Sequence, residues 1–399
     1  MALFKATPGL YLHIPFCRSF CPFCPYNKVL YEPALVQDYF AALTREVDQY
    51  RAHIREPFAS LYIGGGTPSL CLPQLQEIVQ TVPVSGEKAI EVLPSHVTRE
   101  NLDHLQAMGI NYLSLGVQSF DDAVLHYLKR PHTVADNHRA LELAAGRFDC
   151  VDVDLIFDVA YEEAGTFFRD LQTCFEAGVE QVSSYPLMRF GYTPFGKSKH
   201  MPEKEHRVLD QAAELAEKFG YERRSVWTFN RRHTANYTSI TREFYLGCGA
   251  GAGSYTGASF FLNHFSPATY IEKIRSGQLP VARSKLMSAT RSAAYYLFWQ
   301  AYTGRIDCAR FEALFPGRLT LQGLLSTLQW AGMLRREGDG LRLTPRGYAR
   351  YHDLERWVTY HFIEPLWNDM MQEHEFLRGK LPNLSFSQRL WLHFAGLSG

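Results

Sequence analysis

The sequence has no net charge and no long apolar run. Its 41 Lys and Arg residues balance 41 Asp and Glu residues, so no overall field attracts nucleic acid or anionic lipid. No apolar run approaches the roughly 20 residues of a membrane-spanning helix. The first residues also lack the apolar stretch of a signal peptide. We therefore expect a cytoplasmic protein, with no nucleic-acid partner and no transmembrane segment.

Cysteine is scarce but unevenly distributed. The chain has 399 residues and 8 Cys, too few for a disulfide scaffold. Five of them are scattered and fit the role of small buried hydrophobic residues. The other three, Cys17, Cys21 and Cys24, follow one another closely along the chain. This cluster indicates a metal site.

Short apolar runs alternate with helical patterns between residue 9 and about residue 226. A length of 399 residues predicts two to three domains at roughly 150 residues each. Strand–helix alternation implies parallel strands joined by right-handed crossovers, and six units suggest an incomplete barrel or an open sheet. Chemistry in such folds gathers at the carboxyl ends of the strands. The six strands are predicted at residues 10–14, 61–63, 89–93, 112–116, 151–156 and 182–185, and helices between them at 35–54, 99–108, 133–145 and 166–177.

The pattern changes near residue 288, where helices predominate. Two helices and a hairpin over residues 334–343 resemble a winged helix. Acidic residues nearly balance the arginines there, which favours a packing lid over a nucleic-acid surface. Residues 357–371 predict an aromatic helix, interrupted by Pro365, that covers a substrate or the core. We therefore expect a first domain over residues 1–286 and a helical, substrate-covering domain over 287–399.

The cysteine cluster lies directly after the first predicted strand. Short loops of this kind wrap iron–sulfur clusters, and three protein thiolates leave one iron of a cubane without a protein ligand. The alternative is structural zinc with a fourth ligand such as His13. Zinc spacings usually contain two pairs of ligands, and no second pair is present here. The pattern favours the cluster.

Glycine and polar residues follow the other predicted strands. Three glycines at 64–66 let the backbone approach a ligand and present N–H groups to it. A carboxylate, an amide, a guanidinium and a second carboxylate are expected around the strand ends, at Glu91, Gln118, Arg130 and Asp154. Trp227, Tyr255 and Phe260 come after the last barrel strand, and they could line a pocket for a flat ligand or belong to the core.

Taken in order, these motifs resemble the radical S-adenosylmethionine (SAM) family of oxygen-independent coproporphyrinogen III oxidase. The resemblance covers roughly residues 9–275. It implies an α/β fold with a partial (β/α)6 TIM-type barrel and a mainly helical, winged-helix-like C-terminal domain. The motifs are Tyr-Leu-His-Ile-Pro-Phe-Cys at 11–17, Cys-x3-Cys-x2-Cys at 17–24, Gly-Gly-Gly-Thr-Pro-Ser at 64–69, Leu-Gly-Val-Gln-Ser-Phe at 115–120, Arg-Pro-His at 130–132 and Asp-Leu-Ile at 154–156.

The resemblance also implies roles for individual residues. Cys17, Cys21 and Cys24 would hold a 4Fe–4S cluster whose open iron binds a first SAM molecule. Reduction of the cluster would then release a 5′-deoxyadenosyl radical. The positions that match contacts to the first SAM are Tyr11, Gly65 and Glu91. Those that match contacts to a second SAM are Phe23, Gly66, Thr67, Gln118, Arg130 and Asp154, with Gly253 as a further SAM contact.

The resemblance favours the branch of class C radical SAM methyltransferases, which use both SAM molecules to methylate an sp2 carbon of a planar aromatic substrate. Menaquinone, a tetrapyrrole or a heterocycle fits that description. Oxidative decarboxylation, cyclopropanation and non-catalytic haem binding remain open as alternatives. We expect a low-potential electron donor such as flavodoxin or ferredoxin, and a monomer. The pattern identifies no proton-transfer residue.

Overall fold

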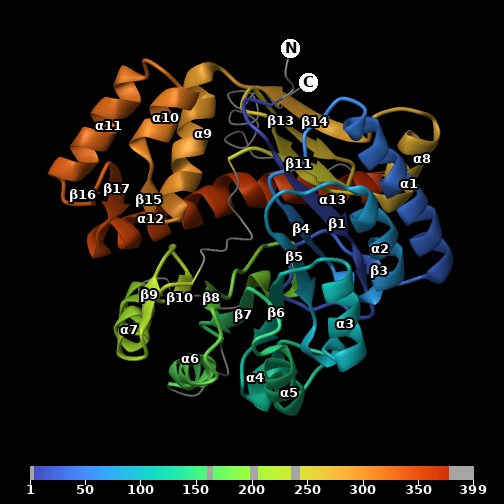
Figure 1. Ribbon diagram of the computed structural model, residues 1–399, viewed down its shortest axis with the longest axis horizontal. Helices are drawn as coiled ribbons and strands as arrows, with labels where there is room; N and C mark the ends of the chain where they lie inside the picture. The colour runs from blue at the N-terminus through green and yellow to red at the C-terminus, as the bar shows by residue number, and fades with distance from the viewer. Residues whose placement is uncertain (1–3, 160–164, 198–204, 235–242, 377–399) are drawn as a thin grey trace.

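The computed structural model describes residues 4–159, 165–197, 205–234 and 243–376 (Figure 1). A mixed sheet of twelve strands, in the order β14-β13-β12-β11-β1-β4-β5-β6-β7-β8-β10-β9, runs through it. Six neighbouring strands of this sheet are parallel and form the partial barrel, as predicted. They are β1 (Gly9–Ile14), β4 (Leu61–Gly65), β5 (Lys88–Val92), β6 (Tyr112–Gln118), β7 (Cys150–Phe157) and β8 (Gln181–Pro186).

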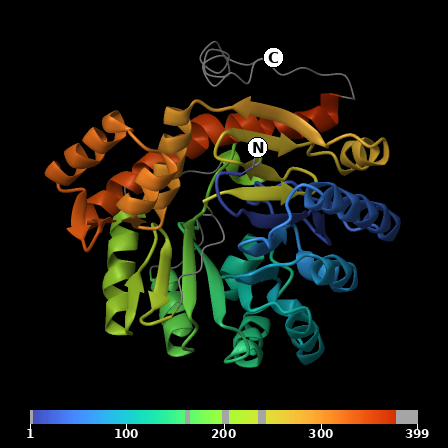
Figure 2. The same cartoon turned by 45° about the horizontal axis from the view of Figure 1, so that its top comes forward.

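Helices connect the parallel strands along the outer side of the curved sheet (Figure 2). Four of the helices confirm the sequence prediction: α1 (Pro33–Arg51), α3 (Arg99–Ala107), α5 (Val134–Ala144) and α6 (Thr166–Glu176). Side chains cap several of them; Thr133, for example, forms a capping box with Asp136 at the start of α5. The pattern did not predict α2 (Leu72–Thr81), α4 (Asp122–Tyr127) and α7 (Glu205–Lys218).

Further strands extend the sheet at both edges. At one edge β11 (Tyr245–Cys248) runs parallel to β1, and three antiparallel strands follow, namely β12 (Gly253–Tyr255), β13 (Ser259–Asn263) and β14 (Val281–Leu286). α8 (Pro267–Arg275) lies between the last two in the chain. The other edge ends in β10 (Thr228–Arg231) and β9 (Tyr221–Arg223). Trp227 and Tyr255 are buried and belong to the core, whereas Phe260 is half-buried.

The C-terminal part is mainly helical and contains the expected hairpin. β16 (Leu334–Glu337) pairs with β17 (Gly340–Leu343), and β15 (Arg305–Ile306) completes a small sheet. The helices before the hairpin are α9 (Ala289–Tyr302), α10 (Cys308–Leu314) and α11 (Leu319–Trp330). In the described ranges no helix is both long enough and apolar enough to cross a bilayer.

A long helical segment follows the hairpin and crosses the end of the barrel (Figures 1 and 2). α12 (Pro345–Val358) continues through a π-helical turn (Thr359–Ile363) into α13 (Glu364–Phe376). The α-helical hydrogen bonding is interrupted just before Pro365, as predicted, because α12 ends at Val358 and the π turn follows it. Pro365 lies in the first turn of α13, where a residue without an N–H group leaves no helical hydrogen bond unmade.

The barrel strands are almost fully buried, which is typical of parallel strands that are covered on both faces. Several half-buried positions lie in the second half of their strands, namely Glu91, Gly116, Asp154 and Tyr185. Tyr11 on β1 is also half-buried. These partly accessible positions are candidates for contact with a ligand.

Candidate functional site

The glycine loop after β4 packs directly on the start of the cysteine loop. The Gly66 N–H donates to the Ile14 carbonyl at 2.8 Å, and the Thr67 N–H donates to the Phe16 carbonyl at 2.8 Å. A Cβ atom at residue 66 would lie 2.7 Å from the Phe16 carbonyl oxygen and 3.0 Å from the Cys17 Sγ. Only glycine therefore lets these two loops approach so closely.

Hydrogen-bond donors surround the three thiols. All three are free; Cys17 is buried, and Cys21 and Cys24 are half-buried. The Thr67 hydroxyl donates to the Cys17 Sγ at 3.7 Å, and the Arg130 Nη1 donates to the Cys21 Sγ at 3.3 Å. Donors aimed at the sulfurs stabilise thiolates and tune an iron–sulfur cluster.

The three thiols are also chemically suitable ligands for an iron–sulfur cluster. Burial raises the pKa of Cys17 to about 11 and raises the pKa of Cys24, so metal binding must displace protons from these thiols. Among the described residues no three His, Cys, Asp or Glu side chains converge on one ion position. A cubane requires no such convergence, because each of its irons binds a different thiolate.

A tyrosine and a histidine on β1 form a fixed pair at the base of the site. The Tyr11 hydroxyl lies 2.7 Å from the His13 Nδ1, and the His13 Nε2 lies 3.0 Å from the Asn27 carbonyl oxygen. Because a carbonyl only accepts, we assign the proton to Nε2 and the acceptor role to Nδ1. Burial lowers the pKa of His13 to about 4, so the ring is neutral.

Glu91 on β5 is held by two donors from the neighbouring strand. The Tyr62 hydroxyl donates to Oε1 at 2.5 Å, and the Gly65 N–H donates to Oε2 at 3.1 Å. Burial raises the pKa of Glu91, and the two hydrogen bonds oppose this shift. The three positions predicted for the first SAM therefore lie on adjacent strands, since β1 pairs with β4 and β4 with β5.

The end of β6 is irregular and brings together two more of the predicted residues, Gln118 and Arg130. Gln118 has a φ of 73°, and the pairing with β7 shifts register next to it. The Arg130 Nη2 donates to the Gly116 carbonyl at 2.8 Å. A Cβ atom at residue 116 would lie 3.2 Å from both the Arg130 Nη2 and the Gln118 Nε2.

Asp154 on β7 lies within the same group of charges. It accepts a hydrogen bond from the Ser114 hydroxyl at 2.9 Å. Burial raises its pKa well above the usual value, and the charges of Asp152 and Glu91 raise it further, whereas Arg130 opposes the shift. Glu91, Arg130 and Asp154 therefore interact electrostatically across the end of the barrel.

Phe23 and Gly253, the other two residues predicted to contact SAM, make packing contacts. Phe23 packs against a small apolar cluster that includes Val124, Leu128 and Leu187. Gly253 begins β12, where a Cβ atom would meet Leu262 at 3.2 Å. The contacts described for these two residues are therefore packing contacts rather than polar contacts with the strand-end residues above.

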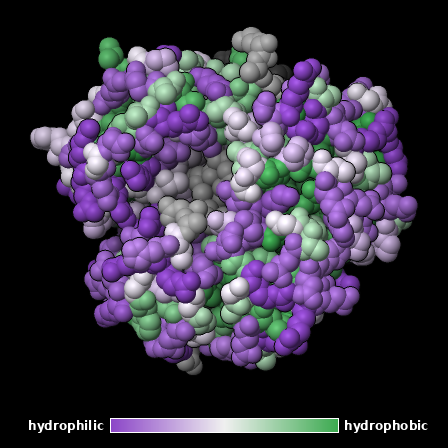
Figure 3. Space-filling view, in the orientation of Figure 1, coloured by the Kyte–Doolittle hydropathy of each residue, from purple (hydrophilic) through white to green (hydrophobic). Residues whose placement is uncertain are grey.

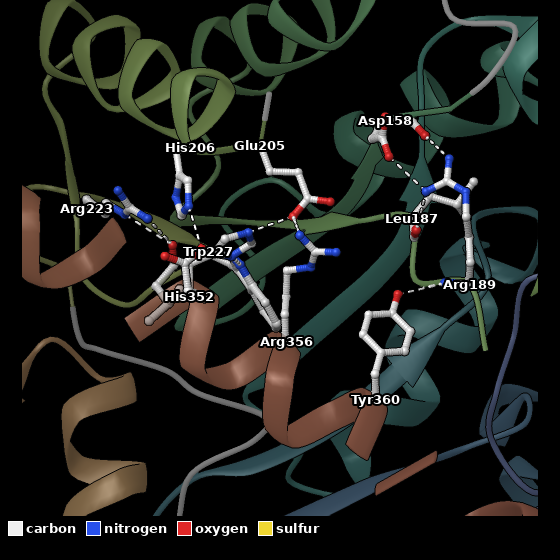
Figure 4. A network of polar contacts seen from close by, with 12 residues as sticks. Asp158, Leu187, Arg189, Glu205, His206, Arg223, Trp227, His352, Arg356 and Tyr360 are labelled. Atoms are coloured by element: carbon white, nitrogen blue, oxygen red, sulfur yellow. Dashed lines mark hydrogen bonds and ion pairs between the residues drawn. The ribbon is translucent and has the colours of Figure 1, made fainter. Parts of the chain in front are cut away.

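The segment from α12 to α13 binds the loop that follows β8. The Tyr360 hydroxyl accepts a hydrogen bond from the Arg189 N–H at 3.1 Å, and Arg189 itself forms an ion pair with Asp158 at 2.8 Å (Figure 4). One turn further on, Glu364 accepts from the Gly191 N–H at 2.5 Å. The face in Figure 3 is largely polar and is hollowed near its centre.

Aromatic contacts bring the same segment to the cysteine loop. The ring of Trp367 stacks on Phe190 at 6.2 Å and lies 5.7 Å from Tyr26, two residues after the last clustered cysteine. The Tyr192 hydroxyl donates to the Pro25 carbonyl at 3.2 Å. The C-terminal helices therefore lie close to the cysteine loop at the carboxyl end of the barrel.

Sequence reasoning missed a buried polar network that joins α12 to the barrel edge (Figure 4). The Trp227 Nε1 donates to the His352 Nδ1 at 3.0 Å, so the His352 Nε2 carries the proton and donates to Glu205 at 2.6 Å. Arg356 pairs with the same Glu205 oxygen at 3.3 Å. Polar residues at core-facing spacing along residues 348–359 were the signal that could have revealed it.

Comparison with known proteins identifies the family of the chain. Residues 11–171 match the family model of the radical SAM superfamily. The chain is 30% identical to the heme chaperone HemW of Bacillus subtilis over 364 residues, which cover 84% of this chain and 95% of that protein. The chain therefore belongs to the radical SAM superfamily, whose members bind a 4Fe–4S cluster and SAM.

The chain is also similar to two proteins that are named as enzymes. It is 28% identical to the oxygen-independent coproporphyrinogen III oxidase of Synechocystis, over 86% of this chain and 83% of that one. It is 26% identical to the anaerobilin synthase of Escherichia coli O157:H7, over 85% and 80%. The solved structure of coproporphyrinogen III oxidase from Escherichia coli shares its fold, with a TM-score of 0.75, 22% identity and coverage of 88% and 90%.

Proposed function

We propose that this radical SAM protein is an enzyme that acts on a tetrapyrrole held between the carboxyl end of the barrel and the segment from α12 to α13. One observation carries the proposal. Arg130 donates one hydrogen bond to the Cys21 Sγ and another to the Gly116 carbonyl at the end of β6. This arginine joins the cysteine loop and the strand-end residues into a single site.

The residues divide between holding cofactors and orienting them. With SAM bound, a reduced 4Fe–4S cluster supplies a 5′-deoxyadenosyl radical that abstracts a hydrogen atom. Cys17, Cys21 and Cys24 would hold that cluster. Tyr11, Gly65 and Glu91 would bind the first SAM; the hydrogen bonds of Glu91 to Tyr62 and Gly65 fix its carboxylate in advance.

The choice of a tetrapyrrole rests on the names of the relatives. Haem and coproporphyrinogen, which appear in the names of two of them, are both tetrapyrroles. The aromatic side chains near the cysteine loop suit a large flat ligand.

We also propose that the chain divides into two domains near residue 286, where β14 ends. Residues 1–286 would bind the cofactors, and residues 287–399 would cover the substrate.

Methyl transfer to an sp2 carbon is a second candidate reaction. The observation that favours it is the group formed by Gln118, Arg130 and Asp154, which would bind a second SAM as the methyl donor. Transfer of that methyl group would leave S-adenosylhomocysteine. Each reductive cleavage of the first SAM consumes one electron, which a donor such as flavodoxin or ferredoxin would supply.

An anaerobic product analysis tests the proposal. The reconstituted protein is incubated with SAM, dithionite and either coproporphyrinogen III, haem or menadione, and 5′-deoxyadenosine and S-adenosylhomocysteine are quantified. We expect deoxyadenosine to depend on a tetrapyrrole, to be lost in Cys21→Ala and to persist in Cys308→Ala, which removes a thiol far along the chain from the cysteine loop. Matched amounts of both products would favour methyl transfer, and deoxyadenosine alone would favour oxidation.

Two results would contradict the proposal. Stoichiometric haem binding without any SAM cleavage would indicate a chaperone. Stimulation by menadione but by neither tetrapyrrole would indicate a quinone substrate.

A further inference from the structure

The face of α12 that packs against the barrel carries a carboxylic acid, Glu355. The buried side chains along α12 and the π turn include Tyr348, Tyr351, His352, Glu355 and Thr359, which repeat at the three- and four-residue spacing of one helix face. Such a face is normally apolar when it packs on a core. Glu355 is 7% exposed and has no apolar role, so its presence there requires an explanation.

The carboxyl group of Glu355 is only half satisfied. Its Oε1 accepts a hydrogen bond from the Thr359 hydroxyl at 3.0 Å. Its Oε2 is buried and has no hydrogen-bond partner in the described part of the chain. Leaving a buried acceptor unpaired is costly, and native proteins do so rarely. His352, one turn earlier on the same face, is by contrast bonded at both ring nitrogens.

The buried face of α12 lies against the end of β8. Tyr351, one turn before Glu355 on this face, packs on Tyr302 with 6.3 Å between the ring centroids. Tyr302 packs on Trp227 at 5.8 Å, and Trp227 packs on Tyr185 at 5.6 Å. Tyr185 is half-buried near the end of β8, which pairs with the strand that carries Asp154. The face that carries Glu355 therefore packs on the same end of the barrel as the predicted cofactor residues.

We propose that Glu355 is a substrate-binding residue whose free Oε2 accepts hydrogen bonds from N–H groups of the ligand. Pyrrole rings of a porphyrinogen present such N–H donors toward one face of the molecule, whereas a quinone offers only acceptors. The inference rests on the proposed function for the kind of ligand, and it adds the residue that would select an N–H-bearing ring system.

A binding experiment without any reductant tests this role, so no radical chemistry is involved. The affinity of the reconstituted protein for coproporphyrinogen III is measured anaerobically for the wild type and for Glu355→Gln. We expect Kd to rise at least about tenfold, because the variant replaces a buried accepting oxygen with an N–H donor. Zinc coproporphyrin, which has no N–H group, should bind equally to both proteins. Asp353→Asn, on the same helix but half exposed and paired with His206, serves as the matched control.

A second variant separates a binding role from a structural one. Glu355→Leu removes the unsatisfied carboxyl, so we expect its urea midpoint to equal or exceed that of the wild type while its affinity for coproporphyrinogen III falls. Unchanged affinity in both variants would overturn the role of Glu355. It would leave the product analysis above unaffected, because deoxyadenosine formation does not depend on this residue being the N–H acceptor.

Discussion

Asp170 on α6 should be essential for the irregular end of β6. It is buried, and its two oxygens accept hydrogen bonds from the Ser119 hydroxyl at 2.6 Å and from the Phe120 N–H at 3.0 Å. Gln118 precedes these residues with a φ of 73°, a conformation that costs a non-glycine residue on the order of 1–3 kcal/mol. The bonds to Asp170 offset that cost and keep the Gln118 side chain beside Arg130.

The size of the effect follows from the two bonds. A hydrogen bond to a charged group contributes about 1.5–3 kcal/mol. Asp170→Ala, which removes both acceptors, should therefore lower the free energy of unfolding by about 4 kcal/mol. Asp170→Asn keeps one acceptor and should lower it by about 2 kcal/mol. Asp103→Ala, a change at a side chain that is 70% exposed, should cost under about 1 kcal/mol.

Urea unfolding gives these energies, and equilibrium dialysis with SAM gives the functional consequence. We expect Asp170→Asn to remain folded at low urea and to bind one SAM normally, while the affinity for a second SAM falls. If Asp170→Ala unfolds at the urea concentration of the wild type, the two hydrogen bonds do not hold this segment. If both SAM affinities fall equally in Asp170→Asn, Gln118 has no special role.

Three further changes test other parts of the site. Gly66→Ala would place a Cβ atom 2.7 Å from the Phe16 carbonyl, so we expect it to retain less iron than Gly323→Ala, whose Cβ atom would meet nothing within 4 Å; equal iron contents would contradict the close packing. Burial raises the pKa of Glu46 to about 7 from 4.5, so the fold should lose up to about 3 kcal/mol as pH rises between these values. Glu46→Gln should flatten that part of the urea-midpoint profile, and an unchanged profile would refute the assignment. Tyr62→Phe removes a donor to Glu91 and should weaken binding of the first SAM several-fold in dialysis, whereas Tyr127→Phe should leave it unchanged.

The parallel strands were predictable because each is a short apolar run bounded by turns. Helices with clear caps and stops, such as α5 after Thr133, were predictable for the same reason. α4 was missed because its six residues are too short for a helical period to be recognised. The π turn before Pro365 was not predicted, because such a turn has no signature in the spacing of apolar residues.

The cysteine loop and its neighbours were predictable because their residues are close in sequence or resemble family motifs. Contacts across long stretches of chain were not. The Arg130–Cys21 bond joins residues 109 positions apart, and no local pattern encodes it. The network of Trp227, Glu205 and His352 likewise depends on how α12 crosses the barrel edge.

The central claim is that Cys17, Cys21 and Cys24 hold a cluster whose open iron binds SAM. The most direct test is electron paramagnetic resonance of the reconstituted, dithionite-reduced protein with and without SAM, together with its iron content. We expect about four irons per chain and a spectrum that changes when SAM is added. Iron retained in Cys21→Ala at the wild-type level, or a wild-type spectrum that does not respond to SAM, would contradict it.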